Sequence, residues 1–386
     1  MPRAIMILTV LLSGPILWAQ EVEVVDGADI RESAVRYLVL NIHGEIGLNV
    51  RTDIMTDALE VVQRVNPDIL VLHIDSSGGN VSEKVQIIDA LSLWRSESST
   101  RVVAFVERAL SAAAFIALTC EDIYMMPTGI IGSAMMVPVD QMGLVRQILK
   151  TGIVEMMASS LRAKNRFAVH TGNHDPPWIE ALSVPKSAIY IRVIDGKPQL
   201  RKLTMSERIH LRMGRDVFAN DDDADVDSPE DRTDDVKWQV LADKDKLLTL
   251  DASEAVDYGL ARGIAKDYQW LARDMGFDGW VLASDELAKL QARQARQTST
   301  VIREWNTQKD VQKSVSLLFL PNSRSSLSKL KRRRHSLGKL IRMATEYPWL
   351  DADMDALKSA NADTQNRIDQ MAASLDRASQ RAERRR

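Results

Sequence analysis

The most constraining feature of the sequence is a regular alternation of short apolar runs and longer amphipathic runs between residues 37 and 118. The apolar runs have the length of buried strands, and the amphipathic runs have the spacing of helices. In chain order the runs are residues 37–42, 52–64, 69–74, 83–94 and 102–106, followed by a helical run from Ser111. This order is typical of parallel strands joined by right-handed helical crossovers. We therefore expect an α/β fold built on a parallel sheet.

Two of these expected strands are followed by turns that are rich in small residues. The first turn contains Gly78 and Gly79, and a glycine pair permits the positive φ angles that turn backbone N–H groups outward. The second turn starts a helix at Ser111, where outward N–H groups and a hydroxyl suit attack on a carbonyl. The two turns together predict that Ser111 is a nucleophile. The alternative role for this serine is a simple helix N-cap.

The segments that contain these turns occur in the same order in one superfamily. Residues 74–81 (IDSSGGNV), 111–134 and 247–264 resemble the NfeD and signal-peptide-peptidase branch of the ClpP/crotonase superfamily. The resemblance extends from about Tyr37 to about Asp267. It implies a ClpP/crotonase-like spiral of ββα units, with the active site where helix N-termini face one another. It also implies serine peptidase activity, a homo-oligomer, and a stomatin-like membrane protein as a partner.

The resemblance also implies which residue removes the proton of Ser111. A ClpP-type histidine would align with Met136, so a Ser-His-Asp triad is not expected. The NfeD branch instead uses a lysine on a later helix, and Lys150, 39 residues after Ser111, matches it best. Lys164 is the reserve candidate, and the alternative role for Lys150 is a surface lysine on an amphipathic helix. A catalytic lysine must be neutral, which requires an apolar pocket that lowers its pKa.

The remaining expected site residues surround the two turns. The backbone N–H groups of Gly79 and Ala112 are expected to form the oxyanion hole, with Gly78, Asn80 and Gly132 near the substrate. Ala113 stands where the family commonly has glycine. If that position required positive φ, alanine would cost roughly 1 kcal/mol or more.

Other features limit the location and chemistry of the chain. Residues 1–20 combine a short positive start with an apolar run that ends at Ala19, which predicts an export signal or an uncleaved membrane anchor. We therefore expect a periplasmic or other extracytoplasmic location. Cys120 is the single cysteine, which excludes an intramolecular disulfide. We find no zinc-type Cys/His spacing, P-loop or dinucleotide fingerprint, and the net charge of -3 does not favour nucleic acid. No metal or cofactor is expected, and Ser133 is expected to be structural.

The composition changes beyond about Ser284 to Gln, Arg, Lys and Ala. We expect a peptidase domain over residues 21–283 and a helical extension over 284–386. Apolar and small residues recur at spacings of four and three from Leu350 to Ala382, which predicts a coiled coil or a helical hairpin over 350–382. The basic run 329–335 is expected to be a solvated surface, as is the acidic run Asp221 to Asp235. Attraction of the basic run to anionic lipid is the alternative.

These features together favour an exported, membrane-associated Ser-Lys endopeptidase. Its expected substrates are hydrophobic segments of membrane proteins or remnants of signal peptides, bound as an added strand beside the glycine pair. The chief alternative is a catalytically inactive ClpP-like scaffold that binds membrane-protein partners. A third candidate is crotonase-type chemistry on a coenzyme A thioester, which an exported location disfavours.

Overall fold

The computed structural model describes residues 34–134, 178, 181–182, 189–194, 197–214, 217, 238–242, 248–315 and 320–384. Apart from Ala34, all of these fall into one compact unit, Val35–Arg386. Lys150, Lys164, Met136 and the expected export signal lie outside the described residues. No helix among the described residues is both long and apolar enough to cross a bilayer.

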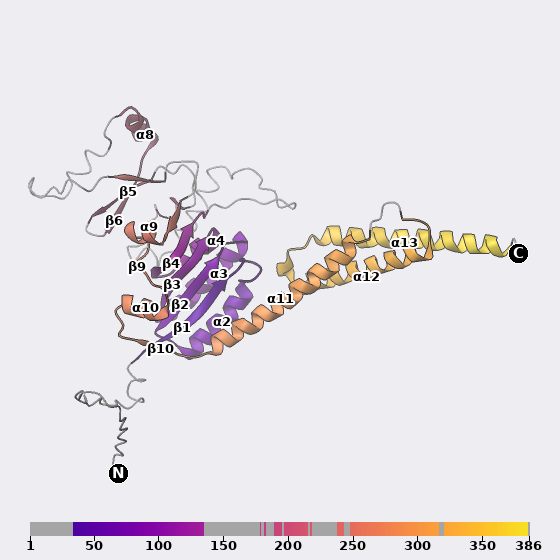
Figure 1. Cartoon of the computed structure of the whole chain (residues 1–386), viewed down its shortest axis with the longest axis horizontal. Coiled ribbons are helices and arrows are strands. Elements are labelled where there is room, and N and C mark those ends of the chain that lie inside the picture. Colours follow the sequence, from indigo (N-terminus) through magenta and orange to yellow (C-terminus); the bar gives the residue numbers. More distant parts are fainter. Residues whose placement is uncertain are drawn as a thin grey trace, which may run out of the picture. The chain divides into compact units, whose positions relative to one another are not determined.

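The main sheet has four parallel central strands, coloured indigo to magenta in Figure 1. They are β1 (Val35–His43), β2 (Ile69–Ser76), β3 (Arg101–Leu110) and β4 (Asp122–Gly132), in that spatial order. The parallel β10 (Trp280–Leu282) extends the β1 side, while the antiparallel β8 (Thr249–Asp251) and the short parallel β9 (Gly263–Ile264) pair with β4. The expected α/β class with a parallel sheet is confirmed.

Helices cover both faces of this sheet. On one face, α2 (Thr52–Val65), α3 (Val81–Ser96) and α4 (Ala112–Ala117) contribute to a core cluster with the inward side chains of all four central strands. On the other face, α10 (Tyr268–Asp274) packs over a smaller cluster that contains Val71, Phe105 and Trp280. Strand β2 is buried over its first four residues because it lies between these two layers.

Other short elements pack beside β4 and in a second sheet. The second sheet is antiparallel, with the order β6 (Lys197–Lys202), β5 (Ile189–Ile194) and β7 (Gln239–Ala242). Helix α8 (Met205–Arg212) lies between β6 and β7 along the chain. The three-residue spacing of Asp251 and Glu254 predicts a capping box, and helix α9 (Ala252–Asp257) begins with one, since Asp251 Oδ1 accepts from the Glu254 N–H at 2.9 Å. The Glu254 carboxylate accepts from the Asp251 N–H at 3.0 Å in return.

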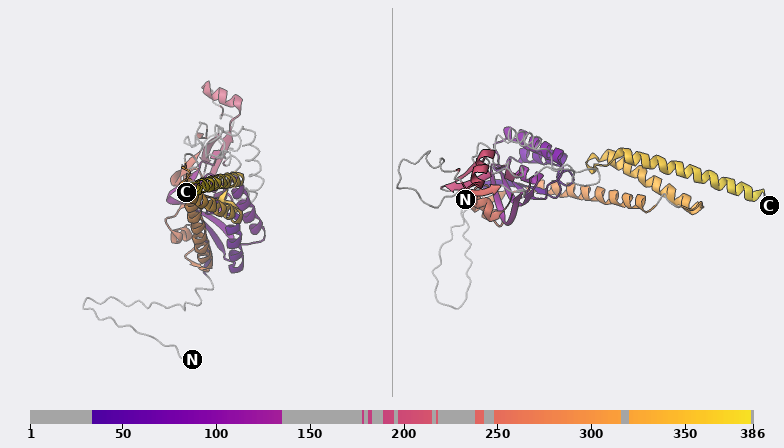
Figure 2. Two further views of the ribbon diagram at one scale, coloured as in Figure 1. Left: turned by 90° about the vertical axis from the view of Figure 1, so that its right-hand side faces the viewer. Right: turned by 90° about the horizontal axis from the view of Figure 1, so that it is seen from above.

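The C-terminal extension consists of three long helices, orange to yellow in Figure 2. They are α11 (Glu286–Lys313), α12 (Arg324–Glu346) and α13 (Met354–Glu383), with a 3-10 turn at Pro348–Leu350. Helices α12 and α13 form a hairpin, and Thr364, Ile368 and Met371 of the expected heptad seam are its buried α13 positions. The helical extension is therefore confirmed, while a coiled coil with another chain stays a prediction.

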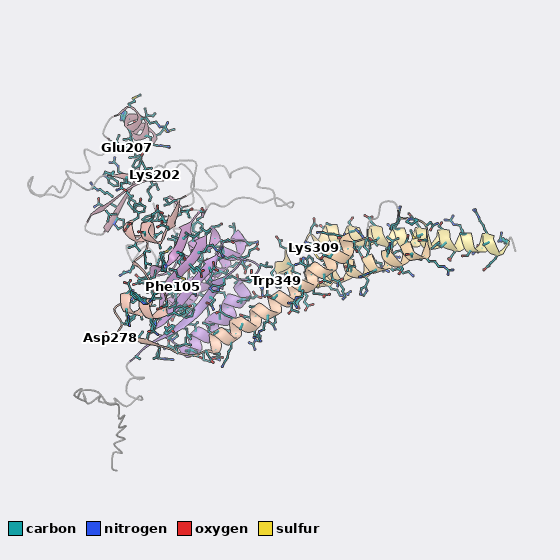
Figure 3. All side chains as sticks on the ribbon, in the orientation of Figure 1. Phe105, Lys202, Glu207, Asp278, Lys309 and Trp349 are labelled. Atoms are coloured by element: carbon teal, nitrogen blue, oxygen red, sulfur yellow. The ribbon has the colours of Figure 1, made fainter. Side chains whose placement is uncertain are left out.

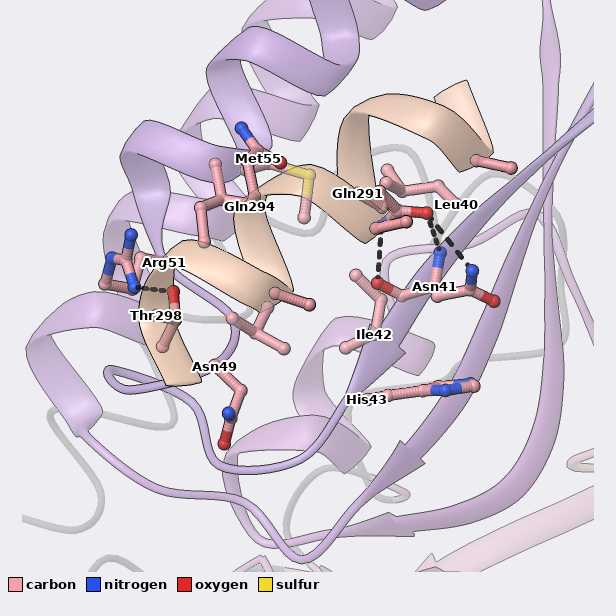
Figure 4. A pocket seen from close by; sticks show the side chains of 15 residues that line it. Leu40, Asn41, Ile42, His43, Asn49, Arg51, Met55, Gln291, Gln294 and Thr298 are labelled. Atoms are coloured by element: carbon pink, nitrogen blue, oxygen red, sulfur yellow. Dashed lines mark hydrogen bonds between the residues drawn. The ribbon is translucent and has the colours of Figure 1, made fainter. Parts of the chain in front are cut away.

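Helix α11 joins this extension to the sheet along the part of the β1 edge that β10 does not pair with. The Gln291 side chain accepts from the Asn41 N–H at 3.1 Å and donates to the Asn41 carbonyl at 2.9 Å. Arg51, before α2, donates to Thr298 of α11 at 3.2 Å. Both contacts border a cavity of about 310 Å³ between β1, α2 and α11 (Figure 4).

Candidate functional site

The glycine turn after β2 has the open backbone geometry that the sequence predicts. Gly78 and Gly79 have φ angles of 98° and 148°. Ile46 pairs with this turn, donating to the Gly78 carbonyl at 2.9 Å and accepting from the Asn80 N–H at 2.8 Å. In this parallel pattern the N–H and carbonyl of Gly79 itself point away from Ile46. The turn therefore presents the Gly79 N–H on its other side.

The serine turn after β3 is strained. Ser111 has φ 53° and ψ −121°, a conformation that glycine adopts readily and other residues avoid. Its N–H donates to the Gly132 carbonyl at 2.9 Å, which continues the pairing of β3 with β4. Its side chain does not cap α4, and Oγ has no hydrogen bond to any described residue. Ser111 therefore occupies the N-cap position without capping the helix through its side chain, and the residue is partly exposed.

The two turns touch one another. A Cβ placed on Gly78 would lie 2.6 Å from the Cβ of Ser111 and 3.0 Å from the Ala112 nitrogen. The first distance is shorter than side chains tolerate and the second is tight, and the φ of Gly78 is positive, so position 78 requires glycine for this approach. The structure thus brings the glycine turn against the first residues of α4. The N–H groups of Ala112 and Ala113 lie in the first helical turn, where no intrahelical acceptor exists.

Ala113 does not impose the cost considered for it. It lies inside α4, is fully buried, and is absent from the four non-glycine residues with positive φ in the described chain. A helical φ accommodates alanine better than glycine. The strained position is Ser111 itself, two residues earlier, and the missing glycine therefore places no strain on the turn.

Gly132 and Ser133 form a third turn, after β4. A Cβ on Gly132, whose φ is 139°, would lie 2.3 Å from the Leu248 carbonyl oxygen. Ser133 also has a positive φ, 47°, but its Oγ hydrogen-bonds to Thr249 Oγ1 at 2.6 Å. This bond ties β4 to the β8 segment, in keeping with the structural role expected for Ser133.

The comparisons with known proteins identify the segment that carries these turns. Residues 39–170 match the family described as NfeD1b, N-terminal domain. Over this segment the chain is NfeD-like. It is also 26% identical over 226 residues to the membrane protein NfeD1b of Bacillus subtilis (strain 168), covering 58% of this chain and 38% of that protein. The resemblance seen in the motifs is confirmed, and the chain spans well under half the length of this relative.

Solved structures with partial similarity are membrane proteases. A lysine-to-alanine mutant of the 1510-N membrane-bound stomatin-specific protease, with a substrate peptide, has 16% identity and a TM-score of 0.40, covering 63% of this chain and 80% of that chain. Its serine-to-alanine mutant has 14% identity and a TM-score of 0.40, covering 66% and 95%. The 1510-N protease specific for a stomatin homolog from Pyrococcus horikoshii has 16% identity and a TM-score of 0.34, covering 62% and 78%. The assignment therefore rests on the sequence match.

The sequence reasoning missed one buried cation next to the serine turn of this NfeD-like segment. Lys84, in the first turn of α3, is 1% exposed, and its Nζ lies 4.3 Å from the centroid of the Phe115 ring in α4. It makes a further interaction as well. The sequence spacing could have predicted that Lys84 is buried, because Lys84 lies on the same face of α3 as the buried Ile87, Ile88 and Leu91.

Asn80 and Asp75 stabilise the ends of the glycine turn in different ways. Asn80 Oδ1 accepts from the Glu83 N–H at 3.0 Å and so caps α3. Asp75 forms an ion pair with Arg108 of β3 at 2.7 Å. Ser76, which the sequence reasoning passed over, accepts from the Gly78 N–H at 3.1 Å and holds the turn from inside.

The two histidines of the NfeD-like sheet lie on the α10 side. His73 Nδ1 hydrogen-bonds to the hydroxyl of Tyr268 in α10 at 2.8 Å, and its ring lies 4.8 Å from that of His43. Burial, and next the neighbouring His43, lower the pKa of His73 to about 4. Neither histidine has a contact with Ser111 among those of the described residues, and no described group of His, Cys, Asp and Glu could hold a metal ion.

Proposed function

We propose that this chain is an exported, membrane-associated serine endopeptidase of the Ser-Lys type. The observation that carries the proposal is Ser111: a partly exposed non-glycine residue held at φ 53°, whose side chain does not cap α4. Such strain persists where surrounding structure fixes it, and it is concentrated at functional sites. The NfeD-like match of residues 39–170 supports the same chemistry at a coarser level.

In the proposed reaction the Ser111 Oγ attacks the carbonyl carbon of a peptide bond. The base takes the hydroxyl proton as the new C–O bond forms, and the N–H groups of Gly79 and Ala112 stabilise the oxyanion. Collapse of the tetrahedral intermediate breaks the C–N bond, and the proton passes to the leaving amine. Water then hydrolyses the acyl-enzyme by the same steps. We assign the base to Lys150, with Lys164 in reserve.

The proposed substrate is an extended, hydrophobic segment of a membrane protein or a signal-peptide remnant. One backbone edge of Gly79 is occupied by Ile46, and the preceding residue, Gly78, lies against the serine turn. A substrate paired with that free edge would place its carbonyl between Gly79 and Ser111, near Gly78, Asn80 and Gly132. By family resemblance a stomatin-like membrane protein is one such partner, and a homo-oligomer is the proposed assembly.

A fluorophosphonate probe tests the nucleophile and the base. We expect the purified wild-type chain to gain the mass of one probe, and Ser111→Ala and Lys150→Ala to gain none. Labelling lost only in Ser111→Ala would move the base to Lys164, which Lys164→Ala then tests. Absence of labelling in wild-type protein with native circular dichroism would overturn the peptidase proposal.

The second candidate is a non-catalytic scaffold for membrane-protein partners. The three long helices of the extension, α11 to α13, favour it because they offer a large surface outside the sheet. A scaffold would bind its partner equally well with Ser111→Ala and would leave the partner uncut. The labelling experiment therefore separates the two candidates.

A further inference from the structure

Helix α12 carries a row of exposed basic side chains along one face. Arg324, Lys331, His335 and Arg342 recur at spacings of seven, four and seven residues, and Arg332 lies beside them. All five side chains are exposed. At 100° per residue the first four fall within a narrow sector of the helix, over a length of about 27 Å. We call these five residues the basic stripe.

No described residue neutralises the basic stripe. None of its five side chains forms an ion pair in the described residues, and α12 carries a single carboxylate, Glu346 at its C-terminal end. Two other cations of the helix are used internally: Lys339 pairs with Glu304 of α11 at 3.5 Å, and Arg333 donates to the Val315 carbonyl at 2.6 Å. The stripe therefore presents unpaired positive charge to an outside partner.

The apolar side of α12 is already occupied. Leu330, Leu337 and Leu340 are buried, and both α11 and α13 pack against this helix. The helix therefore has no apolar face left to insert into a bilayer, and its outer face can act only through charge. A straight row of cations matches the flat, anionic surface of a lipid headgroup layer.

We infer that the basic stripe of α12 docks the helical extension onto anionic phospholipid. Lipid is favoured over nucleic acid because the whole chain carries a net charge of -3, whereas nucleic-acid binding proteins depend on a strongly basic surface. The similarity to the membrane protein NfeD1b points the same way. The inference does not depend on whether Ser111 is reactive.

Vesicle co-sedimentation with the full chain tests this docking. We expect stronger binding to vesicles of phosphatidylcholine with phosphatidylglycerol than to phosphatidylcholine alone, and weaker binding as salt rises. Replacing Lys331, Arg332 and Arg342 by Gln should lower the anionic partition coefficient roughly a hundredfold, since each cation near the surface is worth about fivefold. The matched control replaces Lys358, Arg367 and Arg377, exposed cations of α13, by Gln and should bind like wild type.

Three results would overturn the inference. Equal wild-type binding to both kinds of vesicle would show attachment without the stripe, for example through the N-terminal apolar run. An equal loss in the α13 control would show a response to net charge alone. Salt-sensitive binding to duplex DNA without binding to anionic vesicles would assign the stripe to nucleic acid.

Discussion

Two serines follow neighbouring strands of the main sheet with similar φ angles and different surroundings. Ser111 follows β3 with φ 53°, and Ser133 follows β4 with φ 47°. The Ser133 hydroxyl is bonded to Thr249, whereas the Ser111 hydroxyl has no hydrogen-bond partner among the described residues and lies beside the glycine turn. Positive φ alone is therefore no argument for a nucleophile. The proposal for Ser111 rests instead on three features together: a strained backbone, an oxygen with no hydrogen-bond partner among the described residues, and the N–H groups at the start of α4.

The largest expected difference is in reactivity between these two serines. Ser111→Ala should lower the rate of fluorophosphonate labelling by at least about 1,000-fold, because the nucleophile itself is lost. Ser133→Ala should leave that rate within about twofold and lower the free energy of unfolding by about 1 kcal/mol, the value of one hydrogen bond. Intact mass and urea unfolding measure the two quantities. Equal loss of labelling in both variants would remove the distinction between them.

The next prediction compares two glycines with positive φ, one that contacts the serine turn and one whose added Cβ would contact nothing, so that steric collision can be distinguished from backbone strain. Gly78→Ala should destabilise the fold by roughly 3 kcal/mol and reduce labelling at least tenfold, because its Cβ would collide with Ser111. Gly276→Ala is the matched control, with φ 86° and no atom within 4 Å of the added Cβ. It should cost only about 1 kcal/mol, without loss of labelling. Identical effects of the two variants would show that the collision is unimportant.

A smaller effect on labelling is expected from Lys84, the buried residue that packs against Phe115 of α4. Lys84→Ala should lower the free energy of unfolding by about 3 kcal/mol, because it leaves a cavity against Phe115. Lys84→Met retains most of the volume but loses the charge and the further interaction of Lys84, so it should cost less than Lys84→Ala without being neutral. If α4 shifts with this packing, labelling of Ser111 slows in proportion to the loss of stability. Equal stabilities for the two variants, measured in urea, would contradict a packing role.

The smallest effect is a loss of folding stability at low pH, which should leave both turns intact. Burial favours neutral His73 in the folded state and lowers its pKa to about 4, below the ordinary value of 6.5. The stability gained from the neutral form is present above pH 6.5 and is lost as the pH falls toward 4. The loss should be roughly 2–3 kcal/mol. This loss should be absent in His73→Gln when the free energy of unfolding in urea is measured between pH 7 and pH 4. If the variant keeps the same dependence of unfolding free energy on pH, the loss belongs to other groups, of which His43, Asp75 and Glu107 are nearest.

Local features of the fold could be predicted from the sequence because neighbouring residues determine them. The alternation of strands and helices, the glycine turn and the Asp251–Glu254 capping box all depend on residues a few positions apart. The heptad spacing correctly indicated which face of α13 is buried. It did not indicate that α12 covers that face, because spacing contains no information about the partner.

Features that join distant segments could not be predicted in this way. The bond between His73 and Tyr268 spans 195 positions, and that between Asn41 and Gln291 spans 250. No pattern along the chain marks such pairs. The positive φ of Ser111 was hidden for a similar reason, since its strain is supported by Gly132 on the next strand. The family pattern, with glycine at position 113, suggests strain at Ala113, whereas the residue with positive φ is Ser111.

The Gln291 carboxamide occupies the place that another strand would take beside β1. Beyond Tyr37, where β10 ends, β1 would present unpaired backbone groups, and an open strand edge invites self-association. A protein shortened before α11 would therefore be prone to stack edge to edge, even though it kept both the glycine turn and the serine turn. Solubility of the sheet thus depends on a side chain of the extension, and the two parts should be kept together when the protein is produced.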